Sequence, residues 1–371
     1  MRIVVAMSGG VDSSVAAGLL VEAGHEVIGV HMKLHDAPAS TLAPAGHCCG
    51  LDDALDARSV AARLGIPFYV LNLQEAFSKA VMADFANNYL AGFTPNPCVQ
   101  CNGVLKFDIL LSRARALGAE ALATGHYARV IDGRLYCATD PDKDQSYFLY
   151  PIRPDALERT LFPLGGMTKP EVRGHAERMG LRTAQKPESM EVCFIPDDDH
   201  ARFVESHVAE RAAASGGEVE DYAGDIVDES GRVLGRHAAY HAFTVGQRRG
   251  LGISSTPEVG PLYVLNIDAA SRRVTVGPNS RLAHLGLDAI GMHWIRKPEP
   301  GEPVEARVRH RGARLACTVE ETAERKVRLR FRAPARAASP GQAVVLYSGE
   351  EVLGGATIRK AWTEDAVELS P

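Results

Sequence analysis

Hydrophobic and polar positions form two different patterns along the first 125 residues of the chain. Longer stretches repeat apolar residues at helical spacing and end at glycines, and short apolar runs separate them. The short runs predict strands at Arg2–Ala6, Glu26–Met32, Phe68–Leu73 and Ala121–Thr124, and the longer stretches predict helices at Asp12–Ala23, Leu51–Leu64, Gln74–Leu90 and Val104–Leu117. Strands that alternate with helices are typical of βα units around a parallel sheet, so an α/β domain is predicted.

The pattern changes after this α/β region. Alternating segments on both sides of Asp132-Gly133 predict a hairpin within Tyr127–Thr139. The polar stretch Asp197–Gly217 ends in small residues and predicts a domain boundary. Beyond it, turn signals repeatedly interrupt short β-branched runs. An all-β region is therefore predicted, divided near residue 280 into a small central domain and a C-terminal barrel or sandwich.

The composition is that of a globular protein. Of the 371 residues, 46% are hydrophobic and 23% are charged, and the length suits two or three domains. No apolar run approaches the roughly 20 residues that span a bilayer, and the chain begins with strand-like sequence rather than with a signal peptide. Seven cysteines are too few for a secreted disulfide scaffold. We therefore expect a cytoplasmic protein with no membrane partner, whose thiols serve chemistry or metal binding.

Charge is distributed unevenly along the chain. The formal net charge is −5, yet residues 307–336 hold ten basic side chains against three acidic ones. The alternation of Arg307, Arg309 and Arg311 predicts that these side chains share one face of a strand. A charged strand face is most often merely solvated, but the clustered charge favours binding of phosphate groups.

A candidate phosphate site follows the first predicted strand. The segment Ser8–Ser14 reads SGGVDSS and opens the first predicted helix. Its glycines let the backbone approach an anion closely, and its hydroxyls and the free amides of the helix start supply hydrogen-bond donors. It has neither the lysine nor the spacing of the G-x-x-x-x-G-K-S loop. A glycine turn with a capping residue is the structural alternative, and we interpret the full string as a phosphate-binding loop.

The second candidate site is the pair Cys98 and Cys101, within TPNPCVQCN between two predicted helices. Prolines on both sides of Asn96 remove backbone donors and stiffen a segment that we expect to be an exposed loop. A C-x-x-C pair suits either half of a zinc site or a redox pair. A structural zinc site needs a second pair at similar spacing, whereas Cys48 and Cys49 are adjacent.

Five further strings complete a resemblance to a known family. They are GHYAR at 125–129, KDQSYFL at 143–149, FPLG at 162–165, VCFI at 192–195 and TVGQRRGLG at 244–252. With the two segments above, they make nearly the whole chain resemble the tRNA-specific 2-thiouridylases, which place sulfur at C2 of the wobble uridine of tRNA. We accordingly expect a parallel-sheet PP-loop ATP pyrophosphatase (HUP-like) domain at 1–214, a small β-rich central domain at 215–280 and a C-terminal β-barrel that contacts tRNA at 281–371.

The resemblance also implies roles for individual residues. The ATP contacts would be Ala6, Met7, Ser8, Gly9, Gly10, Val11, Asp12, Ser13, Met32 and Gly125. The tRNA and its target uridine would be contacted by Asn96, Pro97, Cys98, His126, Lys143, Asp144, Gln145, Arg309, His310 and Gln342. Cys101 would be the nucleophile and Cys193 the carrier of a persulfide, whereas Cys137 and Cys317 would be structural. No metal-binding side chain is implied.

The implied reaction replaces the C2 oxygen of a flipped-out uridine with sulfur. The C2 carbonyl resists displacement, so ATP with Mg²⁺ would adenylate its oxygen before sulfur attacks C2 and AMP leaves. Attack of Cys101 on a Cys193 persulfide would supply sulfur, as released sulfide or by direct transfer, and would leave a disulfide between the two. The implied partners are tRNA, a protein that donates persulfide sulfur, and a thiol reductant.

One position departs from the family pattern. Many members carry aspartate where this chain has Cys98. With Cys101 and Cys193, this residue could complete three thiolate ligands of a [4Fe–4S] cluster, but we favour the persulfide relay because two thiols suffice for it. Two other functions stay open. One is an ATP pyrophosphatase that adenylates a small carboxylate or amide and uses ammonia, and the other is a non-catalytic RNA-binding protein whose C-x-x-C holds zinc.

Overall fold

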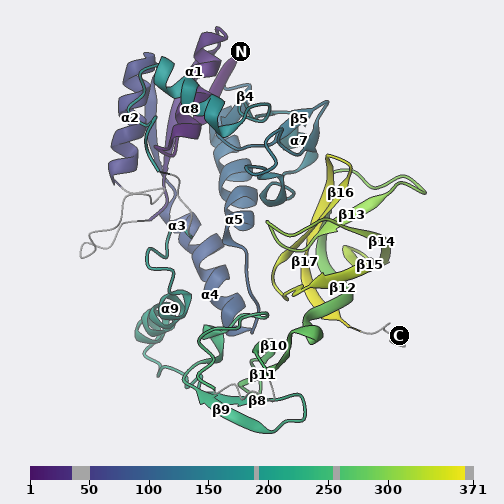
Figure 1. Ribbon diagram of the computed structural model, residues 1–371. Helices are drawn as coiled ribbons and strands as arrows, with labels where there is room; N and C mark the ends of the chain where they lie inside the picture. The colour runs from purple at the N-terminus through teal and green to yellow at the C-terminus, as the bar shows by residue number, and fades with distance from the viewer. Residues whose placement is uncertain (36–50, 188–191, 254–259, 364–371) are drawn as a thin grey trace.

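Residues 1–35, 51–187, 192–253 and 260–363 are described by the computed structural model, which shows three bodies (Figure 1). The N-terminal body contains a five-stranded sheet in the order β3-β2-β1-β4-β7, in which every pairing is parallel. Its strands are β1 (Arg2–Ala6), β2 (Glu26–Lys33), β3 (Phe68–Asn72), β4 (Ala121–Thr124) and β7 (Thr160–Leu161). The predicted α/β class is confirmed, and β7 is a strand that the sequence pattern did not indicate.

Helices cover both faces of this sheet, because successive residues of a strand point to opposite sides. One face of β1 packs against α1 (Val11–Glu22), α2 (Leu51–Leu64) and α8 (Lys169–Arg178). The other face packs against Phe107 and Leu110, which belong to the helix that carries Cys98 and Cys101. The candidate cysteine segment and the candidate phosphate loop therefore lie on one structural unit.

The helix that carries the cysteines spans residues 97–116, and we call it the cysteine helix. It consists of α5 (Pro97–Gln100), the π-helical segment η2 (Cys101–Leu110) and α6 (Leu111–Ala116). The expectation of an exposed cysteine loop, with the helix beginning only at Val104, is wrong. Asn96 accepts a hydrogen bond from the Val99 amide at 3.4 Å, and Pro97 takes the first helical position, where its missing N–H has no consequence. Pro97 therefore starts a helix here rather than stiffening a loop.

A second long helix precedes the cysteine helix, as predicted for Gln74–Leu90. It runs through α3 (Gln74–Phe77), the π-helical η1 (Ser78–Met82) and α4 (Ala83–Leu90). The remaining elements of the N-terminal body are β5 (Arg129–Ile131), β6 (Arg134–Tyr136), η3 (Ser146–Phe148), α7 (Pro154–Leu157) and α9 (His200–Ser215). Strands β5 and β6 form the predicted hairpin, with Asp132 and Gly133 at positive φ in its turn.

The central body is a small four-stranded sheet in the order β10-β11-β8-β9. Its elements are β8 (Gly224–Val227), β9 (Val233–His237), η4 (Tyr240–Ala242), β10 (Leu262–Asp268) and β11 (Arg273–Pro278), and η5 (Asn279–Leu282) leads out of it. Strands β8 and β11 pair in parallel, whereas the other two pairings are antiparallel. The β-rich character predicted for this region is confirmed.

The C-terminal body is a closed six-stranded barrel, because the first strand, β12, also pairs with the last, β17. Its strands are β12 (Ala283–Trp294), β13 (Val304–Arg307), β14 (Leu315–Ala323), β15 (Lys326–Arg336), β16 (Ala343–Ser348) and β17 (Glu351–Trp362). The barrel confirms one of the two architectures that the pattern allowed. The expectation of Arg307, Arg309 and Arg311 on one strand face is wrong, since β13 ends at Arg307 and the other two lie in the following turn.

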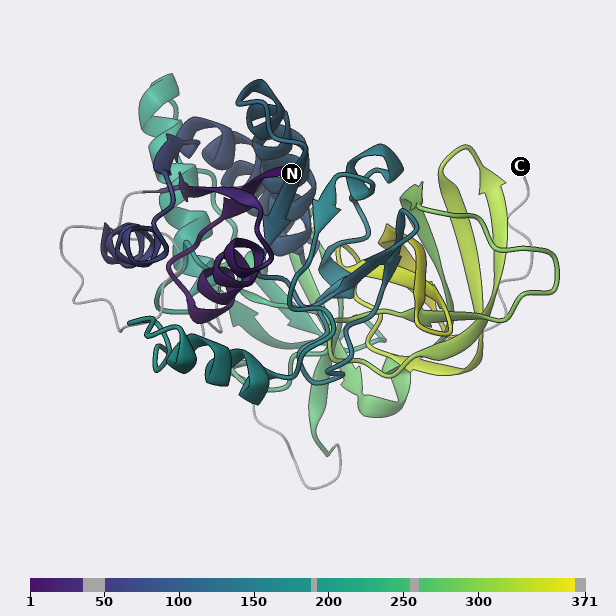
Figure 2. The same cartoon turned by 90° about the horizontal axis from the view of Figure 1, so that it is seen from above.

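The barrel sheet does not stop at the barrel. Residue Glu351 at the start of β17 pairs with Tyr136 of β6, so the β5–β6 hairpin of the N-terminal body extends the barrel sheet to eight strands. Figure 2 shows this hairpin lying between the two bodies. None of the described helices combines the length and apolar character needed to cross a membrane.

Candidate functional site

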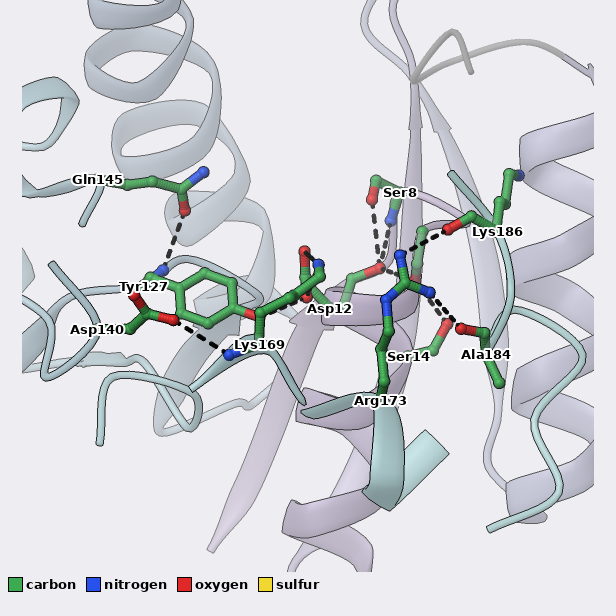
Figure 3. A network of polar contacts seen from close by, with 12 residues as sticks. Ser8, Asp12, Ser14, Tyr127, Asp140, Gln145, Lys169, Arg173, Ala184 and Lys186 are labelled. Atoms are coloured by element: carbon green, nitrogen blue, oxygen red, sulfur yellow. Dashed lines mark hydrogen bonds and ion pairs between the residues drawn. The ribbon is translucent and has the colours of Figure 1, made fainter. Parts of the chain in front are cut away.

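The phosphate loop, Ser8–Ser14, lies between the end of β1 and the first turn of α1 (Figure 3). The Ser13 hydroxyl oxygen accepts a hydrogen bond from the Ser8 amide at 3.1 Å and donates to the Gly10 carbonyl at 3.2 Å. The Ser14 hydroxyl donates to the same carbonyl at 2.8 Å. Among the described residues no side chain caps α1, so the amides of its first turn are available to an anion.

Two glycines at the loop are required by close backbone contacts. Gly9 has φ of +82°, and a Cβ there would lie 2.3 Å from the carbonyl oxygen of Asp53 in α2. A Cβ at Gly125, just after β4, would lie 2.6 Å from the Ser13 nitrogen. By contrast, a Cβ at Gly10 would meet only the Ser8 hydroxyl, at 3.5 Å. Gly10 is therefore the loop glycine whose missing side chain leaves open space.

The carboxylate of Asp12 is held by two residues from outside the loop. Tyr127 donates its hydroxyl to Asp12 Oδ1 at 2.8 Å, and Lys169 Nζ lies 2.8 and 2.9 Å from the two carboxylate oxygens (Figure 3). Lys169 is the first residue of α8, a helix start fixed by reciprocal capping bonds between Thr168 and Glu171. Another helix therefore supplies the lysine that the loop sequence lacks.

The residues expected to hold ATP meet at one edge of the sheet, which we call the nucleotide edge. Ala6 ends β1 and Met7 follows it, Met32 lies near the end of β2, and Gly125 follows β4. These three strands are adjacent and parallel, so their C-terminal ends share that edge. His31 Nδ1 lies 2.9 Å from the Met7 carbonyl oxygen, and burial lowers the pKa of this imidazole. His31 thus connects β2 to β1 as a neutral ring.

The two cysteines expected to act in sulfur transfer, Cys101 and Cys193, share one hydrophobic environment. Cys98 is exposed, and Cys101 and Cys193 are partly buried. Cys101 and Cys193 pack against one hydrophobic cluster, which contains Phe77 and Phe85. In the part of the chain that the structure describes, no three His, Cys, Asp or Glu side chains are grouped to hold a metal ion.

Two other thiols are packing groups. Burial raises the pKa of Cys137 and raises that of Cys317 to about 12, so both are neutral at pH 7. Arg314 donates to the Cys137 sulfur at 2.7 Å, and the Ser146 hydroxyl lies 3.3 Å from it. Cys48 and Cys49 lie outside the described residues.

His126 follows Gly125 and is enclosed by the rings of Phe107 and Phe162. Burial, and secondly the charge of Lys106, holds the pKa of its imidazole well below the usual value. His126 is therefore neutral at pH 7. A contact with tRNA at this residue would involve hydrogen bonding or stacking rather than charge.

The turn expected to contact tRNA, Lys143–Gln145, is strongly bonded inside the protein. The Asp144 carboxylate is buried, accepts bonds from the Ala138 and Ser146 amides, and pairs with Arg307 at 3.3 Å. Gln145 Oε1 accepts from the Tyr127 amide at 3.0 Å, which fixes the residue that binds Asp12. The bonds of Asp144 and Gln145 therefore hold this turn against the rest of the protein.

Residues of the barrel expected to contact tRNA have a second role. Gln342 Nε2 donates to the carbonyl oxygens of Thr94 and Pro95 at 3.0 and 3.1 Å, directly before the cysteine helix. His310 Nε2 lies 3.1 Å from the Asp144 carbonyl oxygen. These contacts join the barrel both to the start of the cysteine helix and to the Lys143–Gln145 turn.

Sequence reasoning missed the polar residues that hold the site together. They are Lys169, Tyr127, Lys106 and Asn102. A signal existed for Lys169, since Thr168 and Glu171 have the spacing of a capping box and place it on the first turn of a helix. No sequence signal placed that helix against the phosphate loop.

Three family models together match most of the chain. Residues 1–197 match a tRNA methyl transferase HUP domain, residues 216–278 a tRNA methyl transferase PRC-barrel domain and residues 285–358 an aminomethyltransferase beta-barrel domain.

Similar full-length proteins carry one name. The tRNA-specific 2-thiouridylase MnmA of Geobacter metallireducens is 50% identical over 98% of this chain and 98% of its own length. The proteins of that name from Geotalea uraniireducens and Mycobacteroides abscessus are 50% and 46% identical, over 99% and 97% of this chain and 96% and 100% of their own lengths.

Proposed function

The chain belongs to the tRNA-specific 2-thiouridylase family, and from this premise we propose that it catalyses the ATP-dependent 2-thiolation of the wobble uridine of tRNA. It is a transferase that acts on tRNA, so we place it in the cytoplasm. We also propose that its domains divide at residues 214 and 280. One observation carries the proposal: the cysteine helix reaches the nucleotide edge, where Lys106 Nζ lies 3.4 Å from Nε2 of His126, the residue after Gly125.

The phosphate loop supports the ATP half of the reaction. The free amides of α1 and the open space at Gly10 would hold the phosphates, and Lys169 stands beside them on Asp12. Mg²⁺ would arrive on the triphosphate and neutralise part of its charge. The adenylated C2 oxygen then leaves as AMP, a far better leaving group than oxide.

The cysteines support the sulfur half. The Cys101 thiolate attacks Sγ of Cys193, the inner sulfur of the persulfide. The Cys101–Cys193 disulfide forms, the bond to the outer sulfur breaks, and that sulfur leaves as hydrosulfide. Hydrosulfide adds to C2, and AMP departs with the original oxygen. In the direct route, the outer persulfide sulfur attacks C2 and AMP leaves. Cys101 then attacks Sγ of Cys193, which releases the thiolated base and forms the same disulfide. A persulfide donor must reload Cys193 and a thiol must reduce the disulfide in each cycle.

A reconstituted assay tests this proposal. The purified chain is incubated with unmodified tRNA, ATP, Mg²⁺, a persulfide donor and a thiol, and the nucleosides are analysed by mass spectrometry. We expect 2-thiouridine together with pyrophosphate release that depends on tRNA. If pyrophosphate is released without tRNA but requires a small carboxylate and ammonia, the protein is instead an ATP pyrophosphatase that acts on a small molecule.

Cysteine variants separate the two halves of the reaction. Cys101→Ser and Cys193→Ser should each abolish 2-thiouridine, whereas Cys193→Ser should still release pyrophosphate with tRNA because activation precedes sulfur attack. Cys317→Ala, a change in the barrel interior, is the matched control and should stay active. Thiolation by Cys193→Ser from a persulfide donor would remove that residue from the mechanism.

The role of Cys98 needs its own variant. In the relay, Cys98 lines the uridine pocket, so Cys98→Asp should keep substantial activity in protein without iron. Anaerobic preparation with iron and sulfide quantification provides the comparison. Activity that follows bound iron and disappears in iron-free protein would contradict the relay.

A further inference from the structure

A partly buried network of polar side chains connects the nucleotide edge to the cysteine helix. Lys106 Nζ donates to Asn102 Oδ1 at 2.9 Å and lies 3.4 Å from His126 Nε2. Asn102 Nδ2 donates to the Phe148 carbonyl at 3.1 Å, and Thr124 Oγ1 lies 2.7 Å from His126 Nδ1. The ammonium of Lys106 is thus oriented by Asn102 of the cysteine helix and by His126 at the nucleotide edge.

Within this polar network, the positive charge lies on Lys106. His126 is neutral at pH 7, and the lysine donates, so Nε2 of the ring acts as acceptor and Nδ1 carries the proton. The Thr124 hydroxyl oxygen accepts a hydrogen bond from Nδ1–H. The histidine therefore positions the ammonium without sharing or neutralising its charge.

Lys106 differs from two other lysines of the N-terminal body, Lys169 and Lys186. Lys169 is paired with Asp12, and Lys186 is paired with both Asp53 and Asp56. Among the described residues, no carboxylate forms an ion pair with Lys106, although its side chain is partly buried. A partly desolvated cation without a carboxylate attracts an anion more strongly than a paired one does.

Lys106 lies where negative charge would develop during the proposed adenyl transfer. It lies on the π-helical segment η2, one turn beyond Cys101, and its ammonium faces the residue after Gly125. π-helical turns are rare and concentrate at functional sites, because they redirect side chains that a regular helix would place elsewhere. The adenyl group and the C2 oxygen must meet between these same two elements if the proposed function holds.

We propose that Lys106 is a catalytic residue whose ammonium contacts the C2 oxygen and the α-phosphate oxygens during adenyl transfer, held in place by Asn102 and His126. This inference rests on the proposed function and adds the group that stabilises its charged transition state. In this role the ammonium neutralises charge on the transferred phosphoryl oxygens and transfers no proton.

Pyrophosphate release in the absence of a sulfur donor isolates this step. Lys106→Met should lower the rate at saturating tRNA and ATP by about 10²- to 10³-fold, as expected when one preorganised donor to developing charge is removed. Binding of tRNA should change by less than about threefold, because one contact among many is lost. Lys106→Arg keeps the charge and should recover at least about tenfold over Lys106→Met.

The controls separate a chemical role from a structural one. Lys79→Met removes an exposed lysine from the neighbouring π-helical segment η1 and should leave the rate unchanged. Thermal unfolding shows whether each variant is folded. If Lys106→Met is unstable, the rate of Lys106→Arg is compared with that of the wild-type protein instead. The inference would be overturned if the Lys106→Met rate lay within threefold of the wild-type rate. Equal losses of rate in folded Lys106→Met and Lys106→Arg would overturn it too. Failure of the unchanged protein to make 2-thiouridine would overturn the proposed function instead.

Discussion

The nucleotide edge and the cysteine helix are supported in opposite ways. At the nucleotide edge, the loop hydroxyls bond within the loop itself, and Asp12 is neutralised by Lys169 of the same body. The cysteine helix begins where other bodies hold the chain. Tyr240 of the central body donates to the Leu90 carbonyl at 2.7 Å, and Gln342 of the barrel donates to the Thr94 carbonyl.

This difference separates the two halves of the proposed reaction. The N-terminal body would organise ATP largely by itself, because all the proposed phosphate contacts lie in its own strands and helices. The segment 91–96, which leads into the cysteine helix, takes its position from the central body and the barrel. Binding of tRNA to the barrel would therefore influence the base site more than the nucleotide site.

The largest expected effect comes from the loop. Gly10→Val adds a side chain where phosphates would lie, with the Ser8 hydroxyl at 3.5 Å as the one close protein neighbour, so the fold should tolerate it. Pyrophosphate release should fall below detection while tRNA binding stays within a few-fold. Gly174→Ala, in an open position on α8, is the matched control and should be fully active. Adenyl transfer retained by Gly10→Val would reject the phosphate-loop assignment.

Removing the lysine beside the loop should have the next largest effect. Lys169→Met leaves the Asp12 carboxylate beside the phosphates without its cation, so adenylation should slow by about a hundredfold through misplacement and repulsion. Lys297→Met breaks an exposed ion pair with Glu321 and should change nothing measurable. The test is the rate of pyrophosphate release at saturating tRNA, and equal rates for both variants would show that Asp12 does not need neutralising.

The barrel contact should affect the base site and spare the nucleotide site. Gln342→Ala removes two hydrogen bonds to the segment before the cysteine helix. At about 1 kcal/mol for a hydrogen bond, thiolation should fall about five- to twentyfold. Binding of ATP without tRNA, measured by calorimetry, should be unchanged. A matching loss of ATP affinity would mean that the barrel also supports the nucleotide edge.

The turn after β13 should make a smaller and salt-dependent contribution. Arg309→Ala combined with Arg311→Ala should weaken tRNA binding and reduce the slope of log affinity against log salt by about 1 to 2. Thiolation at saturating tRNA should survive. Titrations at several salt concentrations measure the slope, and an unchanged slope would mean that both arginines are merely solvated.

Acid should weaken the junction between α9 and the central body slightly. His241 is buried, and burial followed by the charges of His200 and His237 lowers its pKa to about 4. Because the unfolded state binds a proton near pH 6.5 and the folded state does not, stability is full above that pH and declines as pH falls toward 4. Thermal unfolding at pH 7.5 and 5.5 should show a lower Tm at pH 5.5, and His241→Phe should reduce that difference.

Local pattern explains which elements sequence analysis placed correctly. The strands β1 and β4 and the helix 74–90 have strong periodicity that their immediate neighbours reinforce. The start of the cysteine helix was missed because proline was interpreted as a loop signal, although it is favourable at the first helical position. The alternation after Arg307 was misleading because β13 ends there and its turn follows.

The amino-acid sequence by itself determined the βα units, the phosphate loop and the cysteine pair, because each depends on residues that are close along the chain. Tertiary structure alone decided that Lys169 pairs with Asp12, that Lys106 faces His126, and that a hairpin of the first body extends the barrel sheet. Those pairings join residues from separate elements, and many partners of equal chemistry exist in the sequence. Packing of the helices on the sheet and closure of the barrel select among them, because burying a polar group is tolerable only where its partner is already in place.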